Sequence, residues 1–128
     1  MNMFGAGLIA IMALGAVGAA TGAAEAGQCG YAQCWGAVGT GPYDAFGFSH
    51  GYATGSAAWD VAQNGCGRNC DNIQTFFNSC GAIAEASKLG GRGFGQGKTR
   101  AEAEDIALDQ CAANGSSNCT IRVWACSP

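Results

Sequence analysis

The chain has 128 residues, which suffice for one compact domain and argue against two independent domains of ordinary size. Its formal net charge of −3 gives no electrostatic reason to bind nucleic acid or an anionic membrane. The eight cysteines and the single histidine match none of the usual zinc-ligand spacings, so the cysteines indicate disulfides and an oxidising compartment.

Residues 1–26 are nearly all apolar or small and end in Ala24-Glu25-Ala26, a cleavage pattern typical of signal peptides. We expect cleavage before Gly27 and a secreted or periplasmic product. The segment contains no Lys or Arg, unlike most signal peptides. The alternative is an uncleaved anchor that would hold the protein at the outer face of the cytoplasmic membrane, because about 20 apolar residues just span a bilayer.

The rest of the chain, 27–128, is predicted to be a single domain made of two repeats, at about 34–79 and 80–126. A shift of 45 positions places Gly36-Ala37-Val38 on Gly81-Ala82-Ile83. The same shift pairs a threonine, two alanines and a cysteine of the first copy with the same residue types in the second: Thr54, Ala58, Ala62 and Cys66 with Thr99, Ala103, Ala107 and Cys111. Matches spread over thirty positions at one shift indicate an internal duplication.

In chain order, each copy is predicted to contain a short apolar strand (35–38 and 81–84), a second strand after a glycine-rich turn (45–50 and 91–96), a helix, and a closing strand (73–77 and 120–125). Alanines and a cysteine at i+4 spacing, with Val61 or Ile106 beside them, give each helix a narrow face that can lie close to a sheet. Thr99 and Glu102 form a capping box. The predicted class is α+β: two tandem pseudo-symmetric strand-strand-helix-strand units sharing one core and stapled by disulfides.

The duplication restricts how the cysteines pair. One cysteine pair brackets the turn after each helix, and a further pair ties the start of the second copy to its end. The two cysteines before the first strand remain as an N-terminal clip. The predicted pairs are Cys66–Cys70, Cys111–Cys119, Cys80–Cys126 and Cys29–Cys34.

The segments Phe77-Asn-Ser-Cys80-Gly-Ala-Ile-Ala84 and Trp124-Ala-Cys126, together with the preceding strand and helix pattern, resemble a bacterial secreted domain family of unknown function, numbered 4189, which has mycobacterial members. The resemblance covers the whole predicted mature chain. It implies an exported, two-lobed α+β domain, associated in some members with stress or host interaction, and it supplies no catalytic residues.

Three patterns could carry chemistry. The stretch from Gly91 to Thr99 is similar to a phosphate-binding loop, but Arg92 stands where that pattern needs glycine, so a glycine-rich turn running into a helix cap is the better interpretation. His50 is next to Ser49 and near Asp44 and Asp60, the residue types of a nucleophile, base and orienter, yet a lone histidine beside a glycine-rich turn is expected to be a surface residue. A set of carboxylates is read as the solvated face of the second helix: Glu102, Glu104, Asp105 and Asp109.

The densest aromatic set lies in the first copy and comprises Tyr43, Phe46, Phe48, Tyr52 and Trp59. We expect part of it in the core, and Tyr43 and Tyr52 exposed as a contact surface, because rigid aromatic rings give large contact area at little entropic cost.

The function expected from these features is that of an exported, disulfide-rich, non-catalytic interaction module that binds a protein or envelope component. No cofactor, metal site or nucleic-acid partner is expected, and a membrane is expected only if the leader is uncleaved. One alternative is a small envelope hydrolase, with His50 as the first residue to test, or a hydrolase inhibitor. A retained leader would instead favour a membrane-anchored accessory subunit of a larger complex.

Overall fold

The computed structural model describes residues 27–87, 91–115 and 117–128, so the predicted leader, 1–26, lies outside the described residues. The first unit contains three strands and one helix: β1 (Trp35–Thr40), β2 (Phe46–Tyr52), α3 (Gly55–Gly65) and β3 (Asn72–Phe77). The second unit repeats this order: β4 (Ser79–Ala86), β5 (Arg92–Gly97), α4 (Arg100–Ala113) and β6 (Cys119–Ser127). Asn78, with a positive φ of 51°, is the one residue between β3 and β4.

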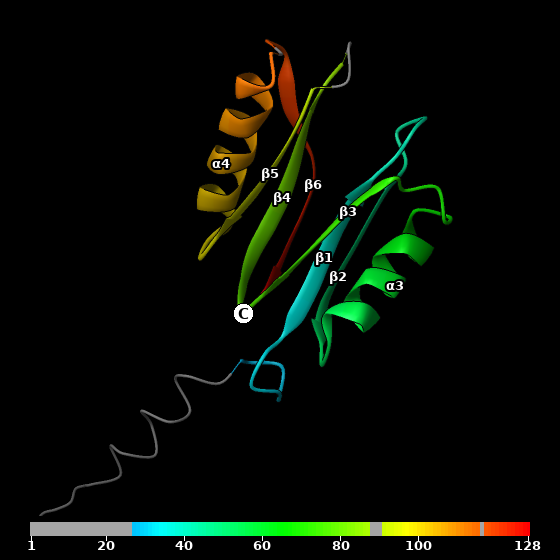
Figure 1. Cartoon of the computed structure of the whole chain (residues 1–128). Helices are drawn as coiled ribbons and strands as arrows, with labels where there is room; N and C mark the ends of the chain where they lie inside the picture. The colour runs from blue at the N-terminus through cyan, green and yellow to red at the C-terminus, as the bar shows by residue number, and fades with distance from the viewer. Residues whose placement is uncertain (1–26, 88–90, 116) are drawn as a thin grey trace, which may run out of the picture.

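Each unit forms its own antiparallel sheet with the first strand in the centre. The strand order is β2-β1-β3 in the first sheet and β5-β4-β6 in the second. The two sheets pack face to face and each carries its helix on the outer side, so the layers follow the order α3, first sheet, second sheet, α4 (Figure 1). The predicted fold class is confirmed.

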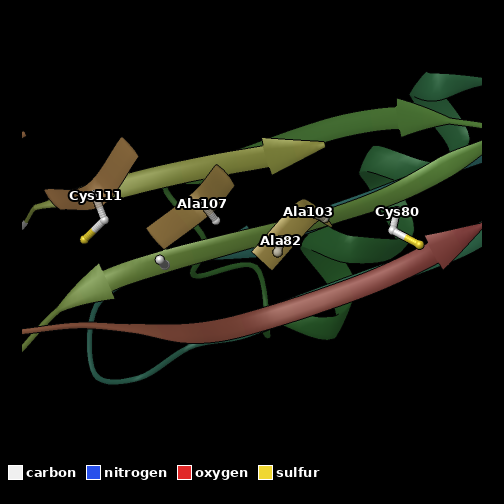
Figure 2. Close-up of a cluster of buried hydrophobic side chains, with 6 residues drawn as sticks. Cys80, Ala82, Ala103, Ala107 and Cys111 are labelled. Carbon is white, nitrogen blue, oxygen red and sulfur yellow. The ribbon is translucent and has the colours of Figure 1, made fainter. Parts of the chain in front are cut away.

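Small residues let each helix lie almost on the backbone of its sheet. Ala103, Ala107 and Cys111 of α4 are fully buried and project toward β4 and β5 (Figure 2). On the strand side, a Cβ added at Gly95 would overlap the carbonyl oxygen of Ala103. Ile106 was expected beside this apolar face, but its side chain is 41% exposed, because the close approach leaves room only for the alanines and the cysteine.

Threonine side chains start both helices. The hydroxyl of Thr54 accepts a hydrogen bond from the backbone N–H of Ala57 at 3.1 Å, and that of Thr99 accepts from Glu102 at 3.2 Å. The carboxylate of Glu102 accepts from the backbone N–H of Lys98 at 2.8 Å, one residue earlier than a regular capping box requires. The two predicted capping residues, Thr99 and Glu102, are therefore confirmed, but Glu102 accepts from Lys98 and not from Thr99.

The shared core lies between the two sheets. Its buried members come from both units, with Val38 and Phe76 facing Ile83, Val123 and Ala125. Because neither sheet could bury this inner face by itself, the two units depend on one another for stability.

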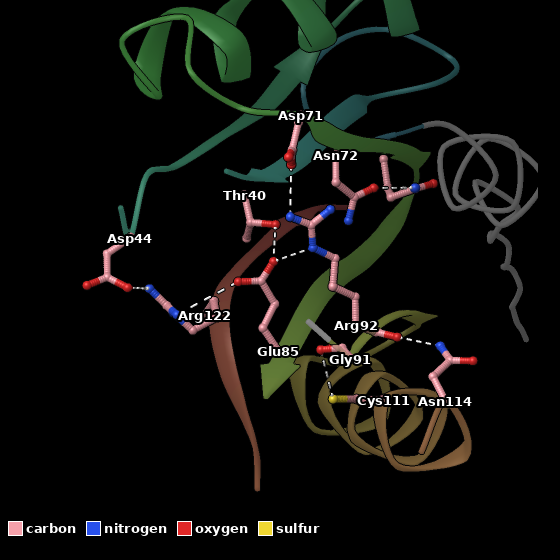
Figure 3. Close-up of polar contacts among 11 residues, drawn as sticks. Thr40, Asp44, Asp71, Asn72, Glu85, Gly91, Arg92, Cys111, Asn114 and Arg122 are labelled. Carbon is pink, nitrogen blue, oxygen red and sulfur yellow. Dashed lines mark hydrogen bonds and ion pairs between the residues drawn. The ribbon is translucent and has the colours of Figure 1, made fainter. Parts of the chain in front are cut away.

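A polar cluster around Glu85 joins the units at one end of this core (Figure 3). The Glu85 carboxylate, whose side chain is 12% exposed, accepts from the Thr40 hydroxyl at 2.7 Å and from Arg92 Nε at 2.8 Å. Arg92 also contacts Asp71 of the first unit at 2.9 Å. Arg122 lies 3.8 Å from the other Glu85 oxygen and donates to an acidic residue of the β1–β2 turn, Asp44, at 2.6 Å.

The four disulfides have the pairing that the sequence predicts: Cys29–Cys34, Cys66–Cys70, Cys80–Cys126 and Cys111–Cys119. Cys80 and Cys126 are direct partners in the β4–β6 register. The equivalent position in the first unit pairs Trp35 with Phe77, whose ring centroids are 4.8 Å apart. The same joint is thus closed by an aromatic pair in one unit and by a covalent bond in the other.

Candidate functional site

An open groove of about 480 Å³ runs between two edge strands, β2 of the first sheet and β6 of the second. Phe46, Phe48 and His50 line it from β2, and residues 122–126 line it from β6. We call this feature the β2–β6 groove.

The phenylalanines reach the groove because β2 alternates large and small residues. Gly47 and Ser49 are buried under α3, so Phe46 and Phe48 point to the opposite face of the strand, toward the second sheet. They remain 51% and 50% exposed. Phe48 pairs with Val38 across the first sheet as Phe94 pairs with a core isoleucine across the second, yet only Phe94 packs against the shared core. The inner face of β2 therefore extends past β6, which is the last strand of its sheet.

The β6 side of the groove is apolar at its base and balanced in charge. Val123 and Ala125 are 5% and 3% exposed and belong to the shared core. Trp124 points toward the α4 side, where the guanidinium of Arg100 lies 4.0 Å from its ring centroid. The cation of Arg122 is already paired with carboxylates of both units. Any occupant of the groove therefore meets aromatic and aliphatic surface without a free charge to neutralise.

The residues around His50 do not assemble into a catalytic group. His50 and Ser49 are neighbours on a strand and so point to opposite faces, and the Ser49 hydroxyl is buried and donates to the carbonyl of Ala58 at 2.7 Å. Asp44 lies at the other end of β2, paired with Arg122, and Asp60 is exposed on α3.

The other patterns singled out from the sequence have structural roles. The stretch 91–99 forms β5 and the cap of α4, as its preferred interpretation predicts. Among the carboxylates of α4, Glu104 pairs with Arg100 at 2.7 Å, and the others lie on the exposed side of the helix. In the described ranges no three His, Cys, Asp or Glu residues lie close enough together to hold a metal ion, and no helix there is long and apolar enough to cross a membrane.

The predicted contact residues are only partly where the sequence places them. Tyr43 is fully exposed at the tip of the β1–β2 turn, where its φ of 59° is positive. Tyr52 is partly buried against Ala37 and the alanines of α3, so less of its ring than of Tyr43 is available for a contact, and its role in a contact surface stays a prediction. Phe46 and Phe48, which belong to the same aromatic set and are more exposed than Tyr52, were not predicted as contact residues. The alternation of large and small residues from Phe46 to His50 is the signal that could have identified them.

The family match covers both units and the residues that line the groove. A family model described as a domain of unknown function, DUF4189, matches residues 35–126. The chain belongs to this family. The DUF4189 fold seen here is similar to the NMR structure of Rv1813c from Mycobacterium tuberculosis, with 30% sequence identity and a TM-score of 0.57 over 73% of this chain and 75% of that one. No curated protein matches the chain.

The disulfides of the structure agree with the oxidising compartment expected from the cysteines. All eight are bridged, and disulfides in such number persist in extracellular or periplasmic proteins rather than in a reducing cytosol. The DUF4189 description itself names no activity, substrate or partner.

Proposed function

We propose that this DUF4189 chain is an exported, non-catalytic binding module whose contact surface is the β2–β6 groove. The observation that carries the proposal is that Phe46 and Phe48 stand half exposed beside each other on a rigid edge strand, facing an apolar hollow. Large apolar side chains gathered in this way mark binding surfaces, whereas scattered single ones carry no such meaning.

The groove has the energetic properties of a binding site. Covering the exposed half of each phenylalanine would contribute about 1 kcal/mol per ring. Both walls are β-strands, and the Cys80–Cys126 bridge staples β6 to β4 directly behind the groove. A partner would therefore lose little affinity to the ordering of this surface.

The enzyme alternative receives less support from the same surface. His50 lines the groove, but the Ser49 hydroxyl, which the sequence places beside it, points to the other side of the strand. A general base needs its proton donor within hydrogen-bond reach. The binding proposal makes no such demand of His50.

The test compares three forms of the exported protein immobilised on a resin and incubated with a native envelope extract. The double variant Phe46→Ser/Phe48→Ser removes both groove aromatics, and Trp59→Ser removes an aromatic of similar exposure, 40%, from the outer helix α3. We expect a retained protein or envelope component that the unmodified chain and Trp59→Ser both capture and the double variant does not.

Equal capture by all three forms would refute the groove as the contact surface. Melting curves of the two variants serve as the control, since both changes replace exposed side chains and should leave the transition within a few degrees of the unmodified protein. Mass spectrometry identifies the captured component.

A further inference from the structure

The backbone of β6 offers hydrogen-bonding groups to the β2–β6 groove. Cys80 and Cys126 face each other across β4 and β6 with Cα atoms 3.9 Å apart, a close approach typical of the non-hydrogen-bonded pairs of an antiparallel ladder. The N–H and C=O of Cys126 therefore point away from β4. Those of Trp124, two positions earlier in the same register, do so as well. Within the described residues, no turn or loop backbone bonds to them.

A vacant strand position lies beside this edge. A strand paired with β6 would lie about 4.8 Å from it, and sheets that pack face to face are about 10 Å apart. The inner face of β2, with Phe46 and Phe48, extends past β6 and so covers this position from the other sheet. A strand in this position would extend the second sheet by one strand and would bury both phenylalanines. Side chains on one of its faces, every second residue, would contact the two rings.

We infer that the β2–β6 groove binds an extended peptide segment of a partner protein, which adds to the free edge of β6 as a further antiparallel or parallel strand. This inference rests on the proposed function and names its ligand class. The segment carries uncharged apolar residues at alternate positions, because the Arg122 cation is already balanced by Asp44 and Glu85 and the rest of the lining, apart from His50 and the bridged Cys126, is aromatic or aliphatic.

A second copy of this chain fits the vacant position poorly. The groove follows five residues of β6, roughly 17 Å of strand, and is one strand wide, whereas a stable dimer needs a face broad enough to bury ~800 Å² per partner. Pairing of two β6 strands would also bring the β2 of each copy over the inner face of the other copy's β6. That face is already covered by its own first sheet, with Val123 and Ala125 buried in the shared core. A single extended segment meets neither obstacle.

The probe is a random peptide library of about a dozen residues, displayed on phage and selected on the exported protein with its disulfides intact. The tightest peptide is then synthesised in two forms, with backbone N-methyl groups on alternate residues, odd or even. Because a strand turns every second amide toward its neighbour, we expect one form to bind about tenfold or more weakly, by loss of two or three hydrogen bonds, while the other form retains its affinity.

Amide hydrogen exchange supplies a readout on the protein side. On peptide binding, the amides of Trp124 and Cys126 should exchange at least about tenfold more slowly, because they gain partners. The amides of Val123 and Ala125 are the internal controls, since they already bond to β4 and should change little. Phe48→Ser should weaken binding of the peptide, and Trp59→Ser should leave it unchanged.

The outcomes separate the two proposals. A peptide that depends on Phe48 but shows no alternation of N-methyl effects would overturn strand pairing and leave the groove as a binding surface. A peptide indifferent to Phe48, or a library that yields no binder, would overturn the peptide inference. A peptide indifferent to Phe48 would also contradict the groove as the contact surface. Sedimentation tests the remaining occupant. If the unmodified chain sediments as a dimer and Phe48→Ser dissociates it, a second copy occupies the groove, and the inference of a partner's peptide is overturned.

Discussion

Removal of the Cys80–Cys126 bridge should cost this protein more stability than removal of the Cys29–Cys34 bridge. The first bridge spans 46 positions and the second 5. If a disulfide acts by restricting the unfolded chain, loops of these lengths correspond to about 4 and about 2 kcal/mol. Cys80 is also 5% exposed and packs in the α4 cluster, so replacement by alanine adds up to about 1 kcal/mol for the space left behind.

The structure raises the cost expected for the shorter bridge. Its position near a chain end suggests a dispensable clip, but Cys34 is fully buried and its backbone N–H donates to the Asn78 side chain at 2.8 Å. The clip therefore helps to hold the junction between the units. We expect about 4–5 kcal/mol for Cys80→Ala/Cys126→Ala and about 2–3 kcal/mol for Cys29→Ala/Cys34→Ala, in which the buried space left by Cys34 adds to the loop term.

Urea unfolding of both double variants and the unmodified protein, followed by circular dichroism, measures the two losses, provided that the slopes of the transitions agree. Equal losses, or a larger loss for the N-terminal pair, would refute the loop-length reasoning. Non-reducing peptide mapping of each variant checks that the remaining three bridges have kept their partners.

Four further changes have expected outcomes. Gly95→Ala should destabilise the protein by about 1–3 kcal/mol in urea, because its Cβ overlaps α4, whereas Gly65→Ala meets nothing nearer than 3.4 Å and should be neutral or stabilising by up to about 1 kcal/mol. Glu85→Ala should cost about 1–3 kcal/mol, less at high salt, because two arginines and a hydroxyl lose their shared acceptor. His50→Ala should change any activity assayed by less than about tenfold; a loss of several hundredfold with an unaltered melting curve would favour the hydrolase alternative. Intact mass after expression in an exporting host should correspond to a chain starting at Gly27; a product that keeps residue 1 and partitions with membranes would favour the anchor.

Local pattern predicted much of the architecture. The two helices, their alanine faces and the order of strands follow from periodicity and turn residues, which act within a dozen positions. The cysteine pairs were predicted from the expected duplication, because equivalent turns such as those at Cys66 and Cys111 should carry equivalent bridges. The contact that joins β1 to β3 was harder to predict from the sequence. Trp35 and Phe77 hold this joint in the first unit, where the second unit has a disulfide.

The groove depends on how the two sheets are offset, which no local pattern encodes. Phe48 and Phe94 have equivalent registers in their own sheets, yet one is half exposed and the other packs on the shared core. The Glu85 cluster was missed for the same reason, because its partners lie on both units and far apart in sequence. The partial burial of Tyr52 was not predicted because its contact with the alanines of α3 depends on how the helix lies across the sheet.

The two ends of the described chain meet. The backbone N–H of Gln28 donates to the carbonyl of Pro128 at 2.9 Å, beside His50 at one end of the groove. Tyr43 is at the far end of β1 and β2, about 20 Å away. Chain that continues before Gly27 or after Pro128 therefore leaves the described part of the protein at the same pole. For a chain cleaved before Gly27, immobilisation through either end would therefore present the Tyr43 pole outward. A label at either end of that chain would lie near His50 and report on groove occupancy.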